Sequence, residues 1–207
     1  LRTAAFVDMI DTDQPRRDSV LSGSVWVAAT RDPARLAWVT AGRTDWKPLL
    51  EDPSVLKIGH NIKFDICILT KHGIHVAPID DTMLISYALE GGAHGHGMDE
   101  LSEMHLGHKP IAYGDVCGTG KNAITFDKVA LDKALNYAAE DADVTLRLHQ
   151  ALKPRLIQER LLTVYETIDR PLVPVVAAMG CAGIKVDTKA LQALSKDFAQ
   201  RIGELER

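Results

Sequence analysis

The pattern of hydrophobic and polar positions changes character near residue 62. Before it, short apolar and β-branched runs at 3–7, 24–29, 36–40 and 55–59 are separated by turn residues, which is typical of strands. The turn between the second and third runs predicts an antiparallel meander. After residue 62, apolar residues recur every three or four positions, which is typical of amphipathic helices.

The helical part of the chain is predicted to contain several separate helices. Asp81 has the side chain and position to cap a helix through Tyr87. The longest periodic stretch runs from Asp127 to about Leu152, and Pro154 is expected to kink or interrupt it. Leu84, Met98 and Phe64 are expected in the core. The pattern therefore predicts an α/β domain over residues 1–155 and an all-helical segment over 156–207.

Composition narrows the class of protein. The chain has 207 residues, 46% hydrophobic and 25% charged, close to an average globular protein. No apolar run approaches the roughly 18 residues of a membrane helix, so we expect no membrane partner. Cys67, Cys117 and Cys181 show no CxxC spacing, which argues against a disulfide scaffold or a cysteine zinc site and favours a reducing cytoplasm. The net charge of −4 gives no sign of a basic surface for nucleic acid.

Three acidic residues stand where a sheet protein could assemble a site. Asp8 follows the first apolar run, Asp65 lies one turn into the helix after the fourth run, and Asp141 shares a helix face with Tyr137. Asp143 points away from that face. Each acid taken alone is well explained as a turn, surface-helix or ion-pair residue, so a common site depends on how the chain folds.

The residues around these acids resemble known exonuclease motifs. Gly59–Asp65 carries Asn61 and Asp65 at the spacing of a second exonuclease motif, and Tyr137–Asp141 has the Tyr-x-x-x-Asp form of a third. The intervening tract, including Gly118–Asn122, is similar to the same proteins, and so is the tail at Glu166–Asp187. The sequence thus resembles the 3′–5′ proofreading exonuclease domain of bacterial family A DNA polymerases, followed by the start of the polymerase domain.

The resemblance implies a fold and a division of the chain. It implies an RNase H-like mixed sheet flanked by helices over residues 1–155, and a truncated, helical start of the polymerase domain over 156–207. The implied partners are a single-stranded or frayed DNA 3′ end and the remainder of the polymerase chain. The implied state is a monomer in the cytoplasm, associated with the nucleoid. We expect no polymerase activity from this chain.

The resemblance also implies a chemistry. Phosphodiester hydrolysis places negative charge on the attacking and leaving oxygens, and two divalent cations can stabilise both ends of that displacement. The implied ions are Mg²⁺ or Mn²⁺, which prefer carboxylate oxygens. Their ligands by resemblance are Asp8, Asp65 and Asp141, and Tyr137 would orient the attacking water.

Three further residues are implied to contact nucleic acid. Asn61 would hold the local geometry of its motif and contact the terminal nucleotide. Lys63 would contact phosphate, although a solvated lysine explains this position as well. Lys121, in the Gly118–Asn122 segment, would contact the DNA backbone, although a plain loop explains that segment as well.

One position departs from the family pattern. The family has Asp-x-Glu after the first strand, whereas this chain reads Asp8, Met9 and Ile10. Isoleucine cannot bind a cation, and loss of a carboxylate ligand weakens a metal site. Asp11 or Asp13 could substitute in a register shifted by three residues, which would put Asp8 inside the strand.

Alternative functions therefore remain open. Ile10 favours a vestigial exonuclease fold that serves as a structural module of the polymerase, whereas Asp65, Tyr137 and Asp141 favour an active exonuclease. A nuclease of the same superfamily that acts on RNA is a third reading, against which the polymerase-like tail argues.

A loose cluster of histidines has possible zinc spacing: His94, His96, His105 and His108. A polar loop and a helix surface explain these residues without a metal.

Overall fold

The computed structural model describes residues 2–5, 47–120 and 123–206. The expected strands at 24–29 and 36–40 lie outside these ranges, as do Asp8, Ile10, Asp11, Asp13 and Lys121. The described elements are β1 (Arg2–Ala5), α2 (Lys47–Leu50), β2 (Val55–Gly59), α3 (Lys63–Lys71), β3 (Ile79–Asp81), α4 (Thr82–Glu90), α5 (Met98–Leu106), α6 (Tyr113–Cys117), η2 (Phe126–Lys128), α7 (Leu131–Gln158), α8 (Leu162–Val164), η3 (Tyr165–Asp169), α9 (Arg170–Ala182) and α10 (Thr188–Leu205).

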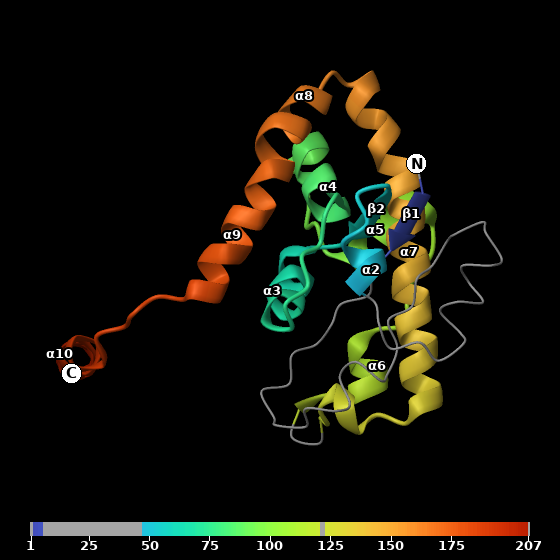
Figure 1. Ribbon diagram of the computed structural model, residues 1–207. Helices are drawn as coiled ribbons and strands as arrows, with labels where there is room; N and C mark the ends of the chain where they lie inside the picture. The colour runs from blue at the N-terminus through green and yellow to red at the C-terminus, as the bar shows by residue number, and fades with distance from the viewer. Residues whose placement is uncertain (1, 6–46, 121–122, 207) are drawn as a thin grey trace.

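The described strands form a parallel sheet in the order β1-β2-β3. Ile58 of β2 stands opposite Ala5 on one side and Asp80 on the other. The long helix α7 crosses the sheet, because Leu146 packs against Ile58 while His149 reaches Asp80 of the next strand. Figure 1 shows α7 beside the strands. The α/β class is confirmed.

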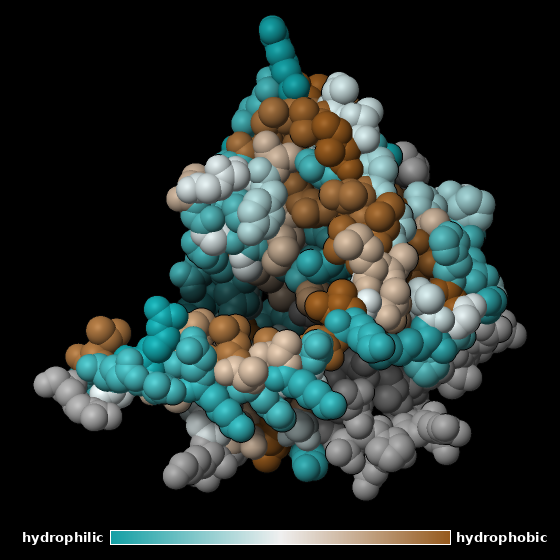
Figure 2. Space-filling view, turned by 90° about the vertical axis from the view of Figure 1, so that its left-hand side faces the viewer, coloured by the Kyte–Doolittle hydropathy of each residue, from teal (hydrophilic) through white to brown (hydrophobic). Residues whose placement is uncertain are grey.

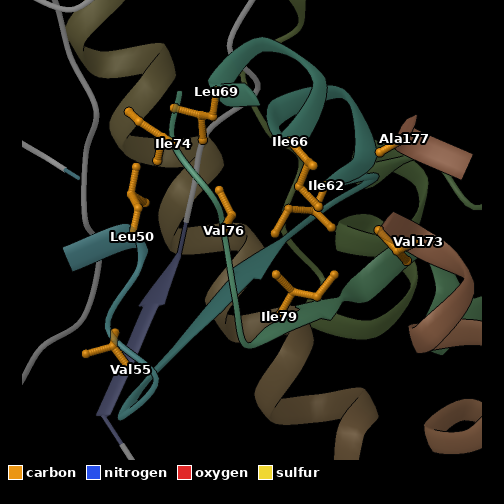
Figure 3. Packing of buried hydrophobic residues seen from close by; sticks show 10 residues of the cluster. All are labelled: Leu50, Val55, Ile62, Ile66, Leu69, Ile74, Val76, Ile79, Val173 and Ala177. Atoms are coloured by element: carbon orange, nitrogen blue, oxygen red, sulfur yellow. The ribbon is translucent and has the colours of Figure 1, made fainter. Parts of the chain in front are cut away.

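Two large hydrophobic clusters, together with the smaller contact between Ile58 and Leu146, make the core of the described residues. The first joins α2, β2, α3 and β3 to α9, and it includes Ile62, Ile79, Val173 and Ala177 (Figure 3). The second packs α4 and α5 against α7 and Tyr165. Residues beyond 156 therefore complete the core of the predicted exonuclease-like part.

Helix α7 extends farther than the sequence predicts. It runs to Gln158 with Pro154 inside it, so an interruption of the helix at this proline, one of the two expected outcomes, is wrong. Leu152 and Leu156, on either side of the proline, are both fully buried in the second cluster, and this packing holds the helix together. The chain instead turns at Arg160, which has a positive φ of 61°. The predicted domain boundary at 155/156 falls inside α7.

The last helix has no buried residues. In Figure 1, α10 lies apart from the rest of the molecule, at the end of an extended connection from α9. Its N-terminus is capped by Asp187, whose carboxylate accepts hydrogen bonds from the backbone N–H groups of Lys189 and Ala190. None of the described helices is long and apolar enough to cross a membrane.

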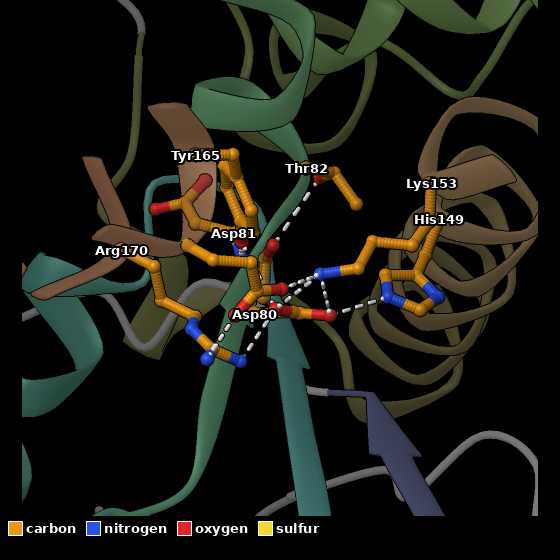
Figure 4. Close-up of polar contacts among 9 residues, drawn as sticks. Asp80, Asp81, Thr82, His149, Lys153, Tyr165 and Arg170 are labelled. Carbon is orange, nitrogen blue, oxygen red and sulfur yellow. Dashed lines mark hydrogen bonds and ion pairs between the residues drawn. The ribbon is translucent and has the colours of Figure 1, made fainter. Parts of the chain in front are cut away.

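Asp80 of β3 connects four side chains from the second half of the chain. Its carboxylate is 2% exposed and lies 2.8 Å from His149 Nε2 and 3.1 Å from Lys153 Nζ. It also accepts a 3.0 Å hydrogen bond from the Tyr165 hydroxyl and pairs with Arg170 at 3.6 Å (Figure 4). One buried carboxylate thus holds α7, η3 and α9 against the sheet.

The charges around Asp80 determine its protonation. Burial by itself raises the pKa of Asp80, but the hydrogen bond from His149 and the charge of Lys153 more than offset this and hold the pKa below its usual value. Burial also raises the pKa of Tyr165, so its hydroxyl remains protonated and can donate. The same hydroxyl accepts the backbone N–H of Asp81 at 3.0 Å.

Asp81, the next residue, performs a second structural task. As expected, it caps α4: its Oδ1 accepts from the backbone N–H groups of Met83 at 2.9 Å and Leu84 at 3.3 Å. The same carboxylate accepts from the N–H groups of Asn61 at 3.0 Å and Ile62 at 2.9 Å. Asp81 therefore fixes the start of α4 and the start of α3 together.

Replacing Asp80 by asparagine is expected to destabilise the fold by about 3 kcal/mol at neutral pH, because it leaves buried or half-buried cations without their counter-charge. Urea denaturation measures this. The matched control is Asp143→Asn, whose partner Arg147 lies 3.5 Å away on an exposed surface; we expect a change below about 0.5 kcal/mol. Equal losses in the two variants would contradict the role of Asp80.

The wild type and Asp80→Asn also provide a test of how stability depends on pH. Because the pKa of Asp80 is lower in the folded chain than its usual 3.8, the ionised carboxylate stabilises the fold above about that pH. The stabilisation is lost as the pH falls through the folded pKa. The difference in free energy of unfolding between the wild type and Asp80→Asn should therefore shrink below pH 3.8; a difference independent of pH would refute this reasoning.

Replacing Asp81 by alanine removes the acceptor of four backbone N–H groups. We expect a loss of about 2–4 kcal/mol in urea denaturation, and a smaller loss for Asp81→Asn, which keeps one acceptor oxygen. Hydrogen exchange should accelerate at the amides of Asn61 and Ile62 in the alanine variant. Unchanged exchange at these two amides would show that Asp81 does not hold the start of α3.

Candidate functional site

The connection between β2 and α3 has a tightly specified backbone. Asn61 adopts a left-handed conformation with φ of 61°, which asparagine tolerates better than most residues. A Cβ atom at Gly59 would lie 2.7 Å from Ile62 Cβ, so a side chain at position 59 would clash with the first turn of α3. These two residues explain the backbone requirements of the Gly59–Asp65 motif.

His60 is held inside the same connection. Its Nδ1 lies 2.8 Å from the Thr82 hydroxyl, and burial lowers the pKa of His60 to about 4. The imidazole is therefore neutral at physiological pH. The contact of His60 with Thr82 and the hydrogen bonds from Asn61 and Ile62 to Asp81 together attach this connection to the start of α4.

Helix α3 presents one buried and two accessible side chains in its first turn. Asp65 is 3% exposed. Phe64 is 55% exposed, so its predicted place in the core is wrong. The reason is the position of the motif at the N-terminus of α3, where Ile62 and Ile66 supply the buried face instead. Lys63 is half-buried, and its Nζ lies 5.4 Å from the centre of the Phe64 ring.

Helix α7 carries the other two predicted residues. Asp141 is 2% exposed, whereas Asp143 on the opposite face has a side chain that is 59% exposed. Tyr137 is half-buried one turn before Asp141. Its ring centre lies 6.2 Å from that of Tyr113 and 5.7 Å from that of Phe126.

The sheet relates these elements to one another. α3 begins where β2 ends, and α7 contacts both β1 and β2. β1 ends at Ala5, three residues before Asp8. The carboxyl ends of parallel strands are where open α/β sheets bind ligands. Asp65 and Asp141 are thus two buried carboxylates on elements that flank β2, while Asp8 lies outside the described residues.

The described carboxylates suit a hard cation. Burying ionised carboxylates is costly unless hydrogen bonds or cations compensate them, and Mg²⁺ or Mn²⁺ accept oxygen ligands of this kind. Asp65 and Asp141, both nearly inaccessible to solvent, fit such ions as donors.

Sequence reasoning missed several residues that shape this region. Asp81 was expected only to cap α4, yet it also fixes the Asn61 backbone. Neither Tyr113 of α6 nor Phe126 of η2 was singled out from the sequence, yet their rings lie beside that of Tyr137. No local pattern signals the hydrogen bonds that Asp81 accepts from Asn61 and Ile62.

Comparison with known proteins identifies the family. A family model described as a 3′-5′ exonuclease matches residues 37–157. The chain is 55% identical over 160 residues to DNA polymerase I of Rhizobium leguminosarum, covering 77% of this chain and 16% of that protein. It is 44% identical over 165 residues to DNA polymerase I of Pseudomonas aeruginosa, covering 78% of this chain and 18% of that protein. The chain thus spans less than a fifth of either polymerase.

Solved structures share the fold. The polymerase domain of Pol1 from M. smegmatis, in complex with DNA primer-template and dNTP, has a TM-score of 0.58 at 22% identity, covering 86% of this chain and 27% of that one. Brucella melitensis NrnC with bound Mg²⁺ has a TM-score of 0.52 at 25% identity, covering 67% and 66% of the two chains. With its exonuclease motifs on α3 and α7 and a family match over more than half its length, the chain belongs to the 3′-5′ exonuclease domain family of the bacterial family A DNA polymerases.

Proposed function

We propose that this chain is the proofreading exonuclease part of a DNA polymerase I and hydrolyses the 3′-terminal phosphodiester of DNA. The observation that carries this proposal is the burial of Asp65 and Asp141, 3% and 2% exposed, on the two elements that flank β2 in a chain of this family. The proposed substrate is a single-stranded or frayed 3′ end, as the resemblance to proofreading exonucleases implies.

Two divalent cations, Mg²⁺ or Mn²⁺, complete the proposed site. When bound, they supply positive charge to the attacking water and to the leaving 3′ oxygen. Asp65 and Asp141 hold them together with Asp8. The Mg²⁺ named for the Brucella neighbour supports the choice of a hard cation.

The other site residues orient the substrate. Tyr137, one helical turn before Asp141, orients the attacking water through its hydroxyl, and the rings of Tyr113 and Phe126 restrict its movement. Asn61, with its backbone held by Asp81, contacts the terminal nucleotide. Lys63 and Lys121 contact phosphates and partly offset the negative charge of the acidic site.

We propose that residues 156–207 are the beginning of the polymerase domain. The chain covers 16% of the Rhizobium polymerase, so most of such a protein lies outside it. Several apolar side chains on α9 and α10 are more than one-third exposed, among them Leu172, Met179, Leu191, Phe198 and Ile202. Figure 2 views the molecule from the side on which these helices lie in Figure 1 and shows hydrophobic residues across it. The remainder of the polymerase chain would cover this surface.

A second function is favoured by one residue. Ile10 replaces the glutamate of the first motif and cannot bind a cation. In that reading the fold is a structural module that supports the polymerase without hydrolysing DNA. The two readings differ in one measurable property, which is release of nucleotides from a labelled 3′ end.

Replacing Asp141 by alanine is expected to reduce 3′–5′ exonuclease activity at least about 100-fold, because a buried metal ligand is lost. The assay follows release of single nucleotides from 3′-labelled single-stranded DNA with Mg²⁺ and then with Mn²⁺, with an RNA oligonucleotide in parallel. Asp143→Ala, two residues away on the exposed face, is the matched control and should retain activity. Wild-type activity no higher than that of Asp141→Ala would exclude the enzyme and leave the structural module.

Replacing Ile10 by glutamate is expected to raise exonuclease activity by at least about 10-fold, because it restores a carboxylate ligand. Ile10→Gln, similar in size but uncharged, should not produce the increase. No gain in Ile10→Glu, together with loss of activity in Asp11→Ala or Asp13→Ala, would show that the shifted register supplies the ligand.

A further inference from the structure

A second group of metal-ligating side chains lies outside the exonuclease motifs. Glu90 ends α4, His94 lies in the following loop, and His105 lies in the last turn of α5. One potential ligand atom from each lies within 4.8 Å of the other two. His94 Nε2 is 2.7 Å and His105 Nε2 is 3.6 Å from the same Glu90 oxygen, Oε2.

We propose that Glu90, His94 and His105 bind a Zn²⁺ ion that ties the glycine-rich loop at 91–97 to α4 and α5. Two imidazole nitrogens and one carboxylate oxygen form a donor set common for zinc, with the fourth position left for water. Mg²⁺ prefers oxygen ligands and its own waters, so this donor set discriminates against the proposed catalytic ion.

The residues around the three ligands already hold them in a binding orientation. His94 Nδ1 lies 2.5 Å from the carbonyl oxygen of Gly95, so this nitrogen donates to the backbone and Nε2 is directed at Glu90. Arg155 of α7 binds the other oxygen of Glu90 at 2.6 Å. Metal-ligating histidines and carboxylates characteristically have such partners, which fix the ligand ring and oxygen in place.

His105 supplies an independent observation. Its Nε2 is buried and forms no hydrogen bond within the part of the chain that the structure describes. A buried polar nitrogen without a hydrogen bond costs free energy, and a metal ion between it and Glu90 Oε2 would remove that cost.

The surrounding charge also suits a cation. Arg155 is positive, but its Nε pairs with Glu159 at 2.9 Å, and Glu100 accepts the N–H of Gly95 at 3.1 Å. Two carboxylates, Glu90 and Glu159, therefore pair with the one guanidinium, and a third, Glu100, lies beside the loop that carries His94.

The other two histidines of the predicted cluster do not belong to this site. Nδ1 of His96 lies 2.7 Å from the Ser86 hydroxyl, and the centre of its ring lies 3.7 Å from that of Tyr87. His108 pairs with Glu140 at 2.8 Å. The structure thus reduces the four histidines of the sequence to two ligands and adds Glu90, which sequence reasoning missed.

The proposed zinc site is distinct from the exonuclease site. Arg155 is fourteen residues after Asp141 on α7, a distance of about 21 Å along a helix. The loop that it would hold contains Gly91, Gly92, Gly95 and Gly97, and glycine loses much conformational freedom when ordered. Zinc at this position would therefore act by ordering the loop and not by taking part in hydrolysis.

The test is a zinc titration of the chain without a histidine tag, treated with a chelator and then saturated with Mg²⁺ to occupy the carboxylates. Calorimetry should detect one Zn²⁺ per chain, and Co²⁺ in its place should give the visible absorption of a low-symmetry site. Zn²⁺ should also raise the melting temperature by on the order of 5 °C.

Variants connect the binding to the three ligands. His94→Ala and His105→Ala should each weaken Zn²⁺ binding at least about 100-fold, and Glu90→Gln, which keeps a contact to Arg155, at least about 10-fold. His72→Ala, at an exposed histidine, and Asp141→Ala should leave binding unchanged. Absence of binding, or binding that survives both histidine variants while circular dichroism shows them folded, would overturn the proposal. Zinc binding that persists in Asp141→Ala separates this site from the exonuclease proposal.

Discussion

Two adjacent carboxylates on the short strand β3 organise most of this structure. Neighbouring residues of a strand point to opposite faces of the sheet, so Asp80 and Asp81 meet different partners. The Asp80 carboxylate forms hydrogen bonds with His149, Lys153 and Tyr165 and an ion pair with Arg170. The Asp81 carboxylate accepts hydrogen bonds from backbone N–H groups at the starts of α3 and α4. Removing either carboxylate would leave buried donors uncompensated, which is why the surrounding elements depend on them.

This arrangement links the exonuclease motifs to the helices beyond residue 156. The Tyr165 hydroxyl donates to Asp80 and accepts from the Asp81 backbone, while Val173 and Ala177 fill the cluster under α3. The geometry of the Asn61 connection therefore rests on packing supplied by the segment that we assign to the polymerase. A substitution in α9 can disturb the exonuclease motif without contacting DNA.

The molecule separates two kinds of ligand chemistry. Buried carboxylates on α3 and α7 suit hard cations, whereas the imidazoles of His94 and His105 with Glu90 suit zinc. Both groups of ligand residues help to explain why a protein for which we propose a DNA substrate has a net charge of −4. Acidic residues concentrated in sites lower the total charge, and bound cations reverse it locally.

The sequence by itself determined the features that depend on neighbouring residues: the helical periodicity, the Asp81 cap of α4, and the motifs that carry Asn61, Asp65 and Asp141. It also places Ile10 where the resemblance predicts a glutamate. Only the tertiary structure decided that α7 continues through Pro154, that Phe64 is exposed, and that Asp80 is shared by residues 69 to 90 positions later. The reason is physical: local patterns encode which face of an element is buried, but the partner that covers it comes from distant segments that meet only when the chain folds.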